Sequence, residues 1–340
     1  MFGTNWHMPA EWEPHSGTWM AWPHAGYTLG ETSQQQDEAR RTWAAVAATI
    51  VDFEPVWMVV DPSATEVARA WLDPRITLIP APLDDAWMRD IGPTFVKGTS
   101  ANVLGKLGGV NWVFNGWGAQ PWATWDADAG IGNFINSQVQ AVKLDSPLIN
   151  EGGGFHVNGA GVVLLTKTVQ LGAGRNSEWT AKEVEAEIHR KLGTDRAIWL
   201  ERGLTRDYDE FGTRGHVDIV ACFANENTIL YHDQQNPQHP DFLVSQEVRQ
   251  TLAEAGNFEL IPVPAPLRLQ DQHGWVDYSY INHYLVNGGV VMCSFDDPND
   301  AVARALLEEV HPARKVVSVD ARPLFDRGGG IHCITQQQPK

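Results

Sequence analysis

The chain has 340 residues, 43% of them hydrophobic and 20% charged, which is enough to bury a core in one large domain or two ordinary ones. Its 42 Asp and Glu residues outnumber its 25 Lys and Arg residues, and the formal net charge of −17 argues against nucleic acid as a partner. No run approaches the ~18 apolar residues of a membrane span, and the first residues lack the pattern of a signal peptide. Three scattered cysteines suit a reducing cytoplasm.

Helix-type and strand-type segments alternate along the chain. Helices are predicted, in chain order, at 35–50, 63–72, 131–143, 177–192, 241–255 and 299–311, with the one at 131–143 the weakest. Strand-type runs lie at 76–82, 161–167, 196–204, 258–266 and 315–325. In one helix, Val184, Ile188 and Leu192 recur at the apolar spacing of a helix face. No low-complexity linker or long charged run marks a boundary, so we expect a single domain over 1–340.

Irregular loops rich in Gly, charged and aromatic residues accompany the strand-type runs. They lie at 84–96, 147–159, 207–223, 271–286 and 326–339. Strand–loop–strand–helix units therefore recur about every 50–65 residues, which is the signature of an internally repeated architecture. The pattern predicts an α/β fold whose units are arranged radially. The alternative is an ordinary open sheet in which helices and strands alternate by coincidence.

In a radial arrangement, the polar residues of the loops would gather near one axis. They are Asp84, Asp85, Asp90, Glu151, His216, Asp218, Asp277, Asn282, His332 and Cys333. A thiolate is the reactive form of cysteine, and a histidine beside it can act as base and later as acid. Carboxylates near a thiol raise its pKa, so they suit a substrate that brings positive charge. Two carboxylates can hold a planar guanidinium by paired hydrogen bonds.

Several of these residues also have plainer explanations. Asp90 could pair with Arg89 on a surface turn, and Glu151 could accept backbone N–H groups of its glycine loop. In G-H-V-D, His216 and Asp218 would share one face of a strand and satisfy each other. The acidic surface could attract a cation, but solvation alone explains it as well. The sequence leaves self-association into a homo-oligomer open.

The three cysteines lie in different surroundings. Cys222 and Cys293 lie inside apolar strand runs and are interpreted as core residues. Cys333 follows three glycines in RGGGIHCITQQQP, where ordering the backbone is entropically costly. The glycines either end a strand or let backbone and ligand come close to the sulfur. Trp87 lies in a segment from which an aromatic ring could stack on a planar cation.

Five motifs, taken in order, resemble the agmatine deiminase family. They are EWEPHSGTWMAWP at 11–23, WMRDIGPTF at 87–95, EGGG at 151–154, GHVD at 215–218 and GGGIHCITQQQP at 328–339. That family is related to the bacterial peptidylarginine deiminases and, more distantly, to arginine deiminase and the amidinotransferases. The resemblance extends from about Met8 to Pro339 and implies a five-bladed, pseudo-symmetric α/β propeller.

The resemblance also implies an activity and roles for residues. The expected reaction is hydrolysis of agmatine to N-carbamoylputrescine and ammonia, a step toward putrescine and the polyamines, with no metal or other cofactor. Cys333 would be the nucleophile that carries a covalent thiouronium, and His216 the general acid and base. Asp90 and Asp218 would bind the guanidinium, Glu151 would support the histidine and substrate, and Trp87 would contact the substrate.

The chain departs from the family pattern beside two motifs. Arg214 and Ile219 flank G-H-V-D where an acidic or amide residue and an asparagine are common, and Gly330 precedes Ile331 where an asparagine is common. These changes put the tail of the substrate in doubt, so peptidyl-arginine or an arginine-like substrate is an alternative. Two further alternatives are a non-catalytic cation-binding protein and a metal-dependent hydrolase. The metal ligands in that case would be His156, His216, Asp218 and His332.

Overall fold

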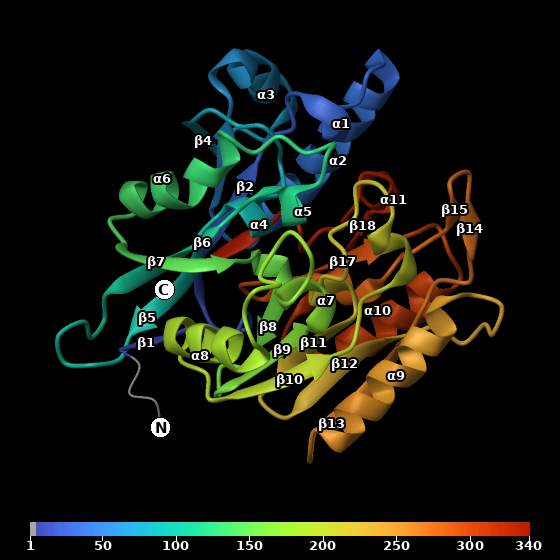
Figure 1. Cartoon of the computed structure of the whole chain (residues 1–340). Coiled ribbons are helices and arrows are strands. Elements are labelled where there is room, and N and C mark those ends of the chain that lie inside the picture. The colour runs from blue at the N-terminus through green and yellow to red at the C-terminus, as the bar shows by residue number, and fades with distance from the viewer. Residues whose placement is uncertain (1–4) are drawn as a thin grey trace.

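The structure is a computed structural model that describes residues 5–340 and has a mixed α/β fold (Figure 1). Its strands are β1 (Trp6–His7), β2 (His15–Ala21), β3 (Val56–Val60), β4 (Thr77–Pro80), β5 (Thr94–Gly98), β6 (Leu107–Val113), β7 (Val142–Ile149), β8 (Phe155–Val157), β9 (Val162–Thr166), β10 (Arg196–Leu200), β11 (Ala221–Asn225), β12 (Thr228–Asp233), β13 (Glu259–Pro264), β14 (Gln270–Asp271), β15 (Gly274–Trp275), β16 (Tyr284–Val286), β17 (Gly289–Ser294), β18 (Lys315–Asp320) and β19 (Gln336–Pro339). Its helices are α1 (Gly26–Leu29), α2 (Ser33–Val51), α3 (Thr65–Trp71), α4 (Met88–Ile91), α5 (Gly116–Ala119), α6 (Ile131–Gln138), α7 (Lys167–Gln170), α8 (Ala181–Leu192), α9 (Asp241–Glu254), α10 (Asn299–Val310) and α11 (Arg322–Phe325). Short 3-10 turns include η3 (Gly152–Gly154), η5 (Val217–Ile219) and η6 (Tyr280–Asn282).

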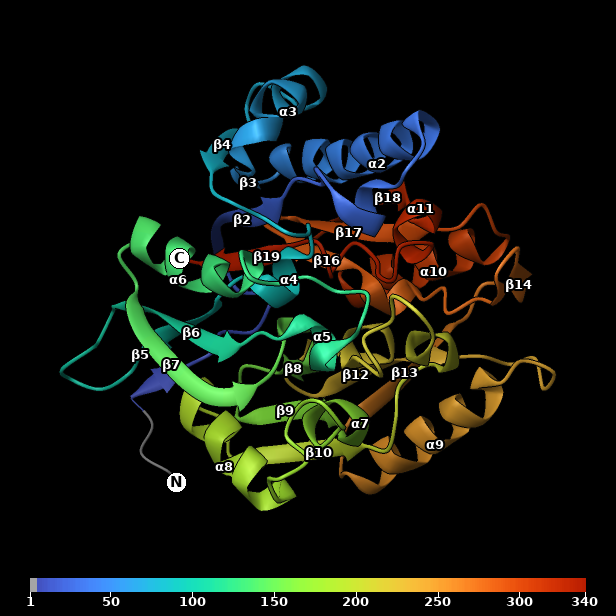
Figure 2. The same ribbon diagram turned by 45° about the horizontal axis from the view of Figure 1, so that its top comes forward.

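One order of strands recurs in the small sheets. An antiparallel pair is followed by a parallel strand in β5-β6-β7, β8-β9-β10, β11-β12-β13, β16-β17-β18 and β19-β2-β3. Parallel neighbours need a crossover connection, which is supplied by α6, α8, α9, α10 and α2, respectively. In Figure 2, α2, α8 and α9 lie at the periphery, with β8, β16 and β19 nearer the middle. The α/β prediction is confirmed, and the propeller arrangement stays a prediction.

Strand β19 joins the two ends of the described chain. It pairs antiparallel with β2, with Gln336 opposite Trp19 and Gln337 opposite Thr18. Arg89, on α4, donates from Nη1 to Gln337 Oε1 at 2.8 Å and from Nε to the His332 carbonyl at 3.2 Å. The segment that follows Cys333 is therefore held by backbone pairing and by a buried guanidinium.

The predicted helices are all present, with corrected ends. Helix α2 begins at a capping box in which Thr32 and Gln35 satisfy each other's backbone N–H groups. The segment 131–143 was predicted too long, because α6 ends at Gln138 and β7 begins at Val142.

The strand predicted for G-H-V-D is wrong. Gly215 has φ of +115°, and the Asp207 carboxylate accepts the backbone N–H groups of both Gly215 and His216. These bonds hold the loop in a turn, so the chain enters η5 before it enters β11. His216 and Asp218 consequently reach the site from a turn.

The core contains the two cysteines interpreted as core residues. Cys222 is 5% exposed and Cys293 is fully buried, and both belong to one cluster of buried hydrophobic residues. All three cysteines are free thiols. Among the described residues, no helix combines the length and apolarity needed to cross a bilayer.

Replacing Gln337 tests how far the β19 segment depends on the buried guanidinium. Gln337→Leu removes an acceptor from Arg89, and we expect the free energy of unfolding to fall by about 1.5–3 kcal/mol, the usual range for a bond to a charged group. Gln338→Leu is the matched control, because it removes only a neutral acceptor from the Trp19 indole, for about 0.5–1.5 kcal/mol. Urea unfolding followed by tryptophan fluorescence measures the free energy of unfolding of both variants. Equal decreases in the two variants would contradict the role given to the Arg89–Gln337 bond.

Candidate active site

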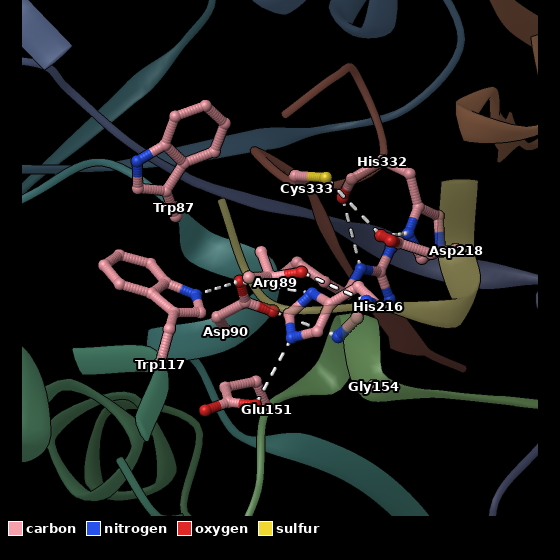
Figure 3. A network of polar contacts seen from close by, with 12 residues as sticks. Trp87, Arg89, Asp90, Trp117, Glu151, Gly154, His216, Asp218, His332 and Cys333 are labelled. Atoms are coloured by element: carbon pink, nitrogen blue, oxygen red, sulfur yellow. Dashed lines mark hydrogen bonds and ion pairs between the residues drawn. The ribbon is translucent and has the colours of Figure 1, made fainter. Parts of the chain in front are cut away.

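Five of the six predicted site residues come together in the interior (Figure 3). They are Asp90 on α4, Glu151 ahead of η3, His216 and Asp218 at η5, and Cys333 in the turn ahead of β19. Each is at most 5% exposed. The convergence of separate loops that the sequence predicted is therefore present for this set.

The Cys333 thiol is held by an amide and faces a carboxylate. Asn282 Nδ2 donates to the sulfur at 3.3 Å, and Asp218 Oδ2 lies 3.5 Å from it. Burial, with the nearby charges of Asp218 and Asp90, raises the pKa of the Cys333 thiol well above its usual value. The thiol is therefore neutral at rest, and its ionisation requires additional positive charge nearby.

The His216 ring lies between two carboxylates. Its Nε2 is 3.3 Å from Glu151 Oε2, and its Nδ1 is 3.9 Å from Asp90 Oδ2 and has no hydrogen-bond partner. Burial opposes the charged ring, but Asp90 and Glu151 outweigh it and raise the pKa of His216 to about 9. His216 is therefore protonated near neutral pH and can donate a proton.

Glu151 is anchored by an arginine that sequence reasoning missed. Arg175 Nε donates to both Glu151 oxygens at 3.0 Å, and both side chains are fully buried. Burial would raise the pKa of Glu151, but Arg175 and His216 together lower it. A second nitrogen of Arg175 donates to the Thr213 carbonyl at 2.8 Å, which ties this pair to the loop leading to His216.

Asp90 is held by neutral donors, and the alternative in which it pairs with Arg89 on a surface turn is not what the structure has. Trp117 Nε1 donates to Oδ2 at 2.9 Å and the Gly153 backbone N–H donates to Oδ1 at 3.0 Å. Arg89 instead bonds toward β19. Burial raises the pKa of Asp90 to about 6, despite the opposing effect of His216. Asp90 is thus an ionised carboxylate at neutral pH, and the protonated His216 ring lies 3.9 Å from it without a hydrogen bond.

Asp218 lies at one end of a line in which a histidine stands between two carboxylates. Its Oδ2 is 2.8 Å from His332 Nδ1, and His332 Nε2 is 2.9 Å from Glu11 Oε2. Burial opposes charge on Asp218 and on His332, yet His332 lowers the pKa of Asp218, while Glu11 and Asp218 together raise the pKa of His332. Asp218 Oδ1 is buried without a hydrogen-bond partner. Glu11 comes from the EWEPH motif, but only the fold reveals its role in this line.

The predicted metal ligands do not form one set in the described part of the chain. Glu11, His156 and His332 do approach within ligand distance of each other, whereas His216 lies outside this group. Both ring nitrogens of His332 are engaged by carboxylates, and the Phe223 backbone N–H donates to His156 Nδ1. These hydrogen bonds already explain why the three side chains lie together. They favour imidazole rings that carry protons over rings that bind a metal ion.

Two glycines make room at the centre. A β-carbon at Gly153 would lie 2.5 Å from His216 Nδ1 and 3.1 Å from Asp218 Oδ2. A β-carbon at Gly329 would lie 2.7 Å from the Trp87 ring and 3.1 Å from the Cys333 sulfur. These positions explain the glycine-rich motifs by close approach of backbone to functional groups. At Gly330 the clash would instead be with Asn282 and Phe325.

Aromatic rings cover the site. Trp87 is 3% exposed and donates from its indole N–H to the Tyr27 hydroxyl at 2.9 Å. Tyr27 stacks on Phe211 with ring centroids 4.4 Å apart, and Trp117 stacks on Trp122 at 5.4 Å. Trp87 is the sixth predicted site residue, and it forms part of this cover beside Gly329.

Other predicted loop residues lie outside this set of polar groups. The backbone N–H groups of Asp84 and Asp85 donate to the Asp128 carboxylate, and the Asp85 side chain lies against Tyr27 and Trp87. Asp277 lines a separate cavity. Arg214, one of the departures from the family pattern, donates to Gln120 Oε1 at 3.3 Å.

Comparison with known proteins agrees with the site. The family described as Porphyromonas-type peptidyl-arginine deiminase matches residues 7–339. Agmatine deiminase of Ectopseudomonas mendocina is 37% identical over 362 residues, which cover 98% of this chain and 95% of that protein. The chain belongs to the agmatine deiminase family.

Two further agmatine deiminase family members are similar over their full length. A Streptomyces coelicolor protein named "Putative agmatine deiminase" is 53% identical over 339 residues, 98% of each chain. The solved structure of Enterococcus faecalis agmatine deiminase matches with a TM-score of 0.90 and 28% identity, covering 100% of this chain and 99% of that one. The family resemblance predicted from the five motifs is confirmed.

In this agmatine deiminase family member, Gly153→Ala tests the packing against His216. The added carbon would displace the ring from Asp90 and Glu151, so we expect the pKa of His216 to fall from about 9 toward the ordinary histidine value. Histidine NMR titration, with the signal assigned by its loss in His216→Gln, measures this. Gly130→Ala is the control, because nothing lies within 4 Å of its β-carbon position. An unchanged titration in Gly153→Ala would refute the packing argument.

Proposed function

We propose that this protein hydrolyses agmatine to N-carbamoylputrescine and ammonia through a covalent thiouronium on Cys333. The observation that carries the proposal is a buried thiol that shares its surroundings with a protonated histidine and two carboxylates. Relatives that cover the whole chain are named agmatine deiminase, which supports agmatine as the guanidino substrate.

The substrate cation would occupy the space between Asp90 and Asp218. Asp218 Oδ1 lacks a donor and Asp90 accepts hydrogen bonds from neutral groups, whereas a guanidinium supplies N–H donors and one positive charge. The same charge favours ionisation of Cys333, whose proton leaves to solvent as the cation enters. Trp87, beside Gly329 and the sulfur, would lie against the planar cation.

The first half of the reaction forms a carbon–sulfur bond. The Cys333 thiolate attacks the central guanidinium carbon, and the resulting tetrahedral centre loses ammonia after His216 donates a proton to the departing nitrogen. A thiouronium cation then remains on the sulfur. Asp90 and Asp218 stabilise the positive charge throughout, while Glu151, anchored by Arg175, keeps His216 protonated and oriented.

The second half returns the enzyme to its resting state. Water enters where ammonia left, and neutral His216 removes a proton from it as its oxygen attacks the thiouronium carbon. The carbon–sulfur bond then breaks as the hydroxyl proton of the tetrahedral centre passes to the leaving sulfur, so the neutral thiol is restored and the ureido product leaves. No step in this sequence requires electron transfer.

The alternative substrates are less well supported. The site residues are at most 5% exposed and lie beside stacked aromatic rings, which suits a small molecule better than a polypeptide. A non-catalytic cation-binding protein would gain nothing from a thiol beside a protonated histidine.

The wider context is proposed on the same basis. The five recurring sheets support a single catalytic domain, 1–340, whose units are arranged radially as a five-bladed propeller. Three free thiols suit the cytoplasm. The excess of acidic residues suits a protein that does not bind nucleic acid. The product, N-carbamoylputrescine, would serve as a source of putrescine for polyamine synthesis.

An ammonia-release assay tests the function directly. We expect release from agmatine at a kcat/KM at least 100-fold above that for free arginine or a peptidyl-arginine. Cys333→Ala should abolish turnover, because a methyl group cannot replace the nucleophile. Cys293→Ser is the control, because that thiol lies in the core and donates to the Asn282 backbone carbonyl at 3.1 Å, a bond that a serine hydroxyl can also make. Turnover by Cys333→Ala, or a preference for peptidyl-arginine, would refute the proposal.

The pH profile tests the assignment of acid and carboxylate. Activity needs Asp90 ionised and His216 protonated, so kcat/KM should rise as pH passes about 6 and fall as pH passes about 9. Glu151 raises the pKa of both groups, so Glu151→Gln should move both limbs to lower pH while its amide oxygen still accepts from Arg175. The exposed Glu226→Gln should leave the profile unchanged. An alkaline limb that stays fixed in Glu151→Gln would remove His216 from this role.

A further inference from the structure

One asparagine side chain contacts the reacting sulfur. Asn282 is the last residue of η6 and is fully buried. Its Nδ2 donates to the Cys333 sulfur at 3.3 Å. The reaction proposed above gives the proton transfers to a histidine and the substrate's positive charge to two carboxylates. The Asn282 amide therefore touches the nucleophile but has no part in those steps.

The neighbours of this amide fix its orientation. The His332 backbone N–H donates to Asn282 Oδ1 at 3.0 Å, and Asn282 Nδ2 donates to the Asp218 backbone carbonyl at 3.1 Å. A backbone N–H can only donate and a carbonyl can only accept, so exchanging the oxygen and nitrogen of the amide would break both bonds. The second N–H of Nδ2 is consequently left for the sulfur.

The ionised sulfur gains most from this contact. The neutral thiol can donate its own proton to Asp218 Oδ2 at 3.5 Å or to Asn282 Oδ1 at 3.6 Å. A thiolate can only accept, so it keeps the bond from Nδ2 while its contact with Asp218 becomes repulsive. Hydrogen bonds to an ionised group are roughly twice as strong as those between neutral groups. The amide therefore stabilises the thiolate more than the thiol.

Other neighbours of the sulfur act in the opposite direction. Burial raises the pKa of the Cys333 thiol, and so do the charges of Asp218 and Asp90. Hydrogen bonds from the Gly330 backbone and from the Asn282 side chain lower that pKa. A backbone N–H stays in place when a side chain is exchanged, so the Asn282 amide is the donor that a substitution can remove.

We infer that Asn282 is a further catalytic residue, whose side-chain N–H stabilises negative charge on the Cys333 sulfur during the reaction. It acts when the thiolate forms and attacks the guanidinium carbon. It acts again when the carbon–sulfur bond lengthens and charge returns to the sulfur. No bond of Asn282 is made or broken, and its amide keeps both protons. This inference rests on the proposed function, because it assigns a role within that reaction.

Ammonia release from agmatine measures the contribution of this donor. Asn282→Ala removes the N–H from the sulfur, and we expect kcat/KM to fall at least tenfold, because a bond to an ionised group is lost. The matched control is Asn158→Ala. Asn158 is 2% exposed, and its amide also bridges backbone groups, donating to the Glu226 carbonyl at 3.0 Å and accepting from the Ala160 N–H at 2.9 Å. Neither contact involves the sulfur, so this variant should keep kcat/KM within twofold.

Agmatine binding without the sulfur separates this role from a structural one. Asn282→Ala also removes the bonds to the Asp218 carbonyl and the His332 N–H, although that N–H keeps the Asn282 backbone carbonyl as an acceptor at 3.2 Å. In protein that already carries Cys333→Ala, calorimetry should give agmatine affinities within threefold of each other with and without Asn282→Ala. A merely structural role would instead weaken agmatine binding there as well.

A second variant serves if Asn282→Ala fails to fold, as judged by circular dichroism. Asn282→Asp keeps the side-chain size and the oxygen that accepts from the His332 N–H. As a neutral acid its carboxyl group has one proton for two acceptors, the Asp218 carbonyl and the sulfur, and as an anion it has none. It should therefore also lower kcat/KM at least tenfold.

Two results would overturn the inference. One is a fall in kcat/KM of less than tenfold in a folded Asn282 variant. The other is an agmatine affinity that falls more than threefold when Asn282→Ala is added to Cys333→Ala. A failure of the proposed function is distinguishable from both, because the wild-type protein would then release no ammonia from agmatine.

Discussion

Charge neutrality in a buried volume is the constraint on which the rest of the site depends. Four carboxylates and four cationic side chains lie together beneath the surface: Glu11, Asp90, Glu151 and Asp218, with Arg89, Arg175, His216 and His332. The two histidines complete the balance only because their neighbours hold them protonated. With the thiol neutral these eight side chains have no net charge, so one entering guanidinium group and one thiolate preserve the balance among them.

The positions of these charges come from segments far apart in the chain. Glu11 and His332 are separated by 321 residues, and Arg89 and Gln337 by 248. The pairing of β19 with β2 brings them together, and the turns at η3 and η5 supply the remaining groups. A substitution that disturbs the pairing of β19 with β2 is therefore expected to alter the electrostatics at Cys333, even where the substituted residue does not contact the substrate.

Much of the fold could be predicted from the sequence, since helix periodicity and capping are local signals. Thr180 and Glu183 form a capping box at the start of α8, as Thr32 and Gln35 do at α2. The turn at G-H-V-D could not be predicted, because it depends on the Asp207 carboxylate accepting backbone N–H groups eight and nine residues further along the chain. There, side-chain hydrogen bonds within the loop override the alternating pattern typical of a strand.

The same division holds for the site. Glycine-flanked motifs identified the cysteine, the histidine and the carboxylates, because close packing of backbone against these side chains requires glycine at the neighbouring positions. The partners that set their protonation, Arg175 and Trp117, had no such mark, since a lone arginine or tryptophan usually serves packing or solvation. Asp277 belonged to a predicted loop, but its separation from the other carboxylates is a property of the fold.

The neutral resting state of Cys333 has a consequence for damage by oxidants. Peroxides and electrophiles react with thiolates, and susceptibility follows ionisation and exposure. With its pKa raised and its side chain 5% exposed, this sulfur is a poor target while no cation is bound. Burial and the neighbouring carboxylates therefore protect the sulfur from oxidation, because they keep it as the unreactive neutral thiol between turnovers.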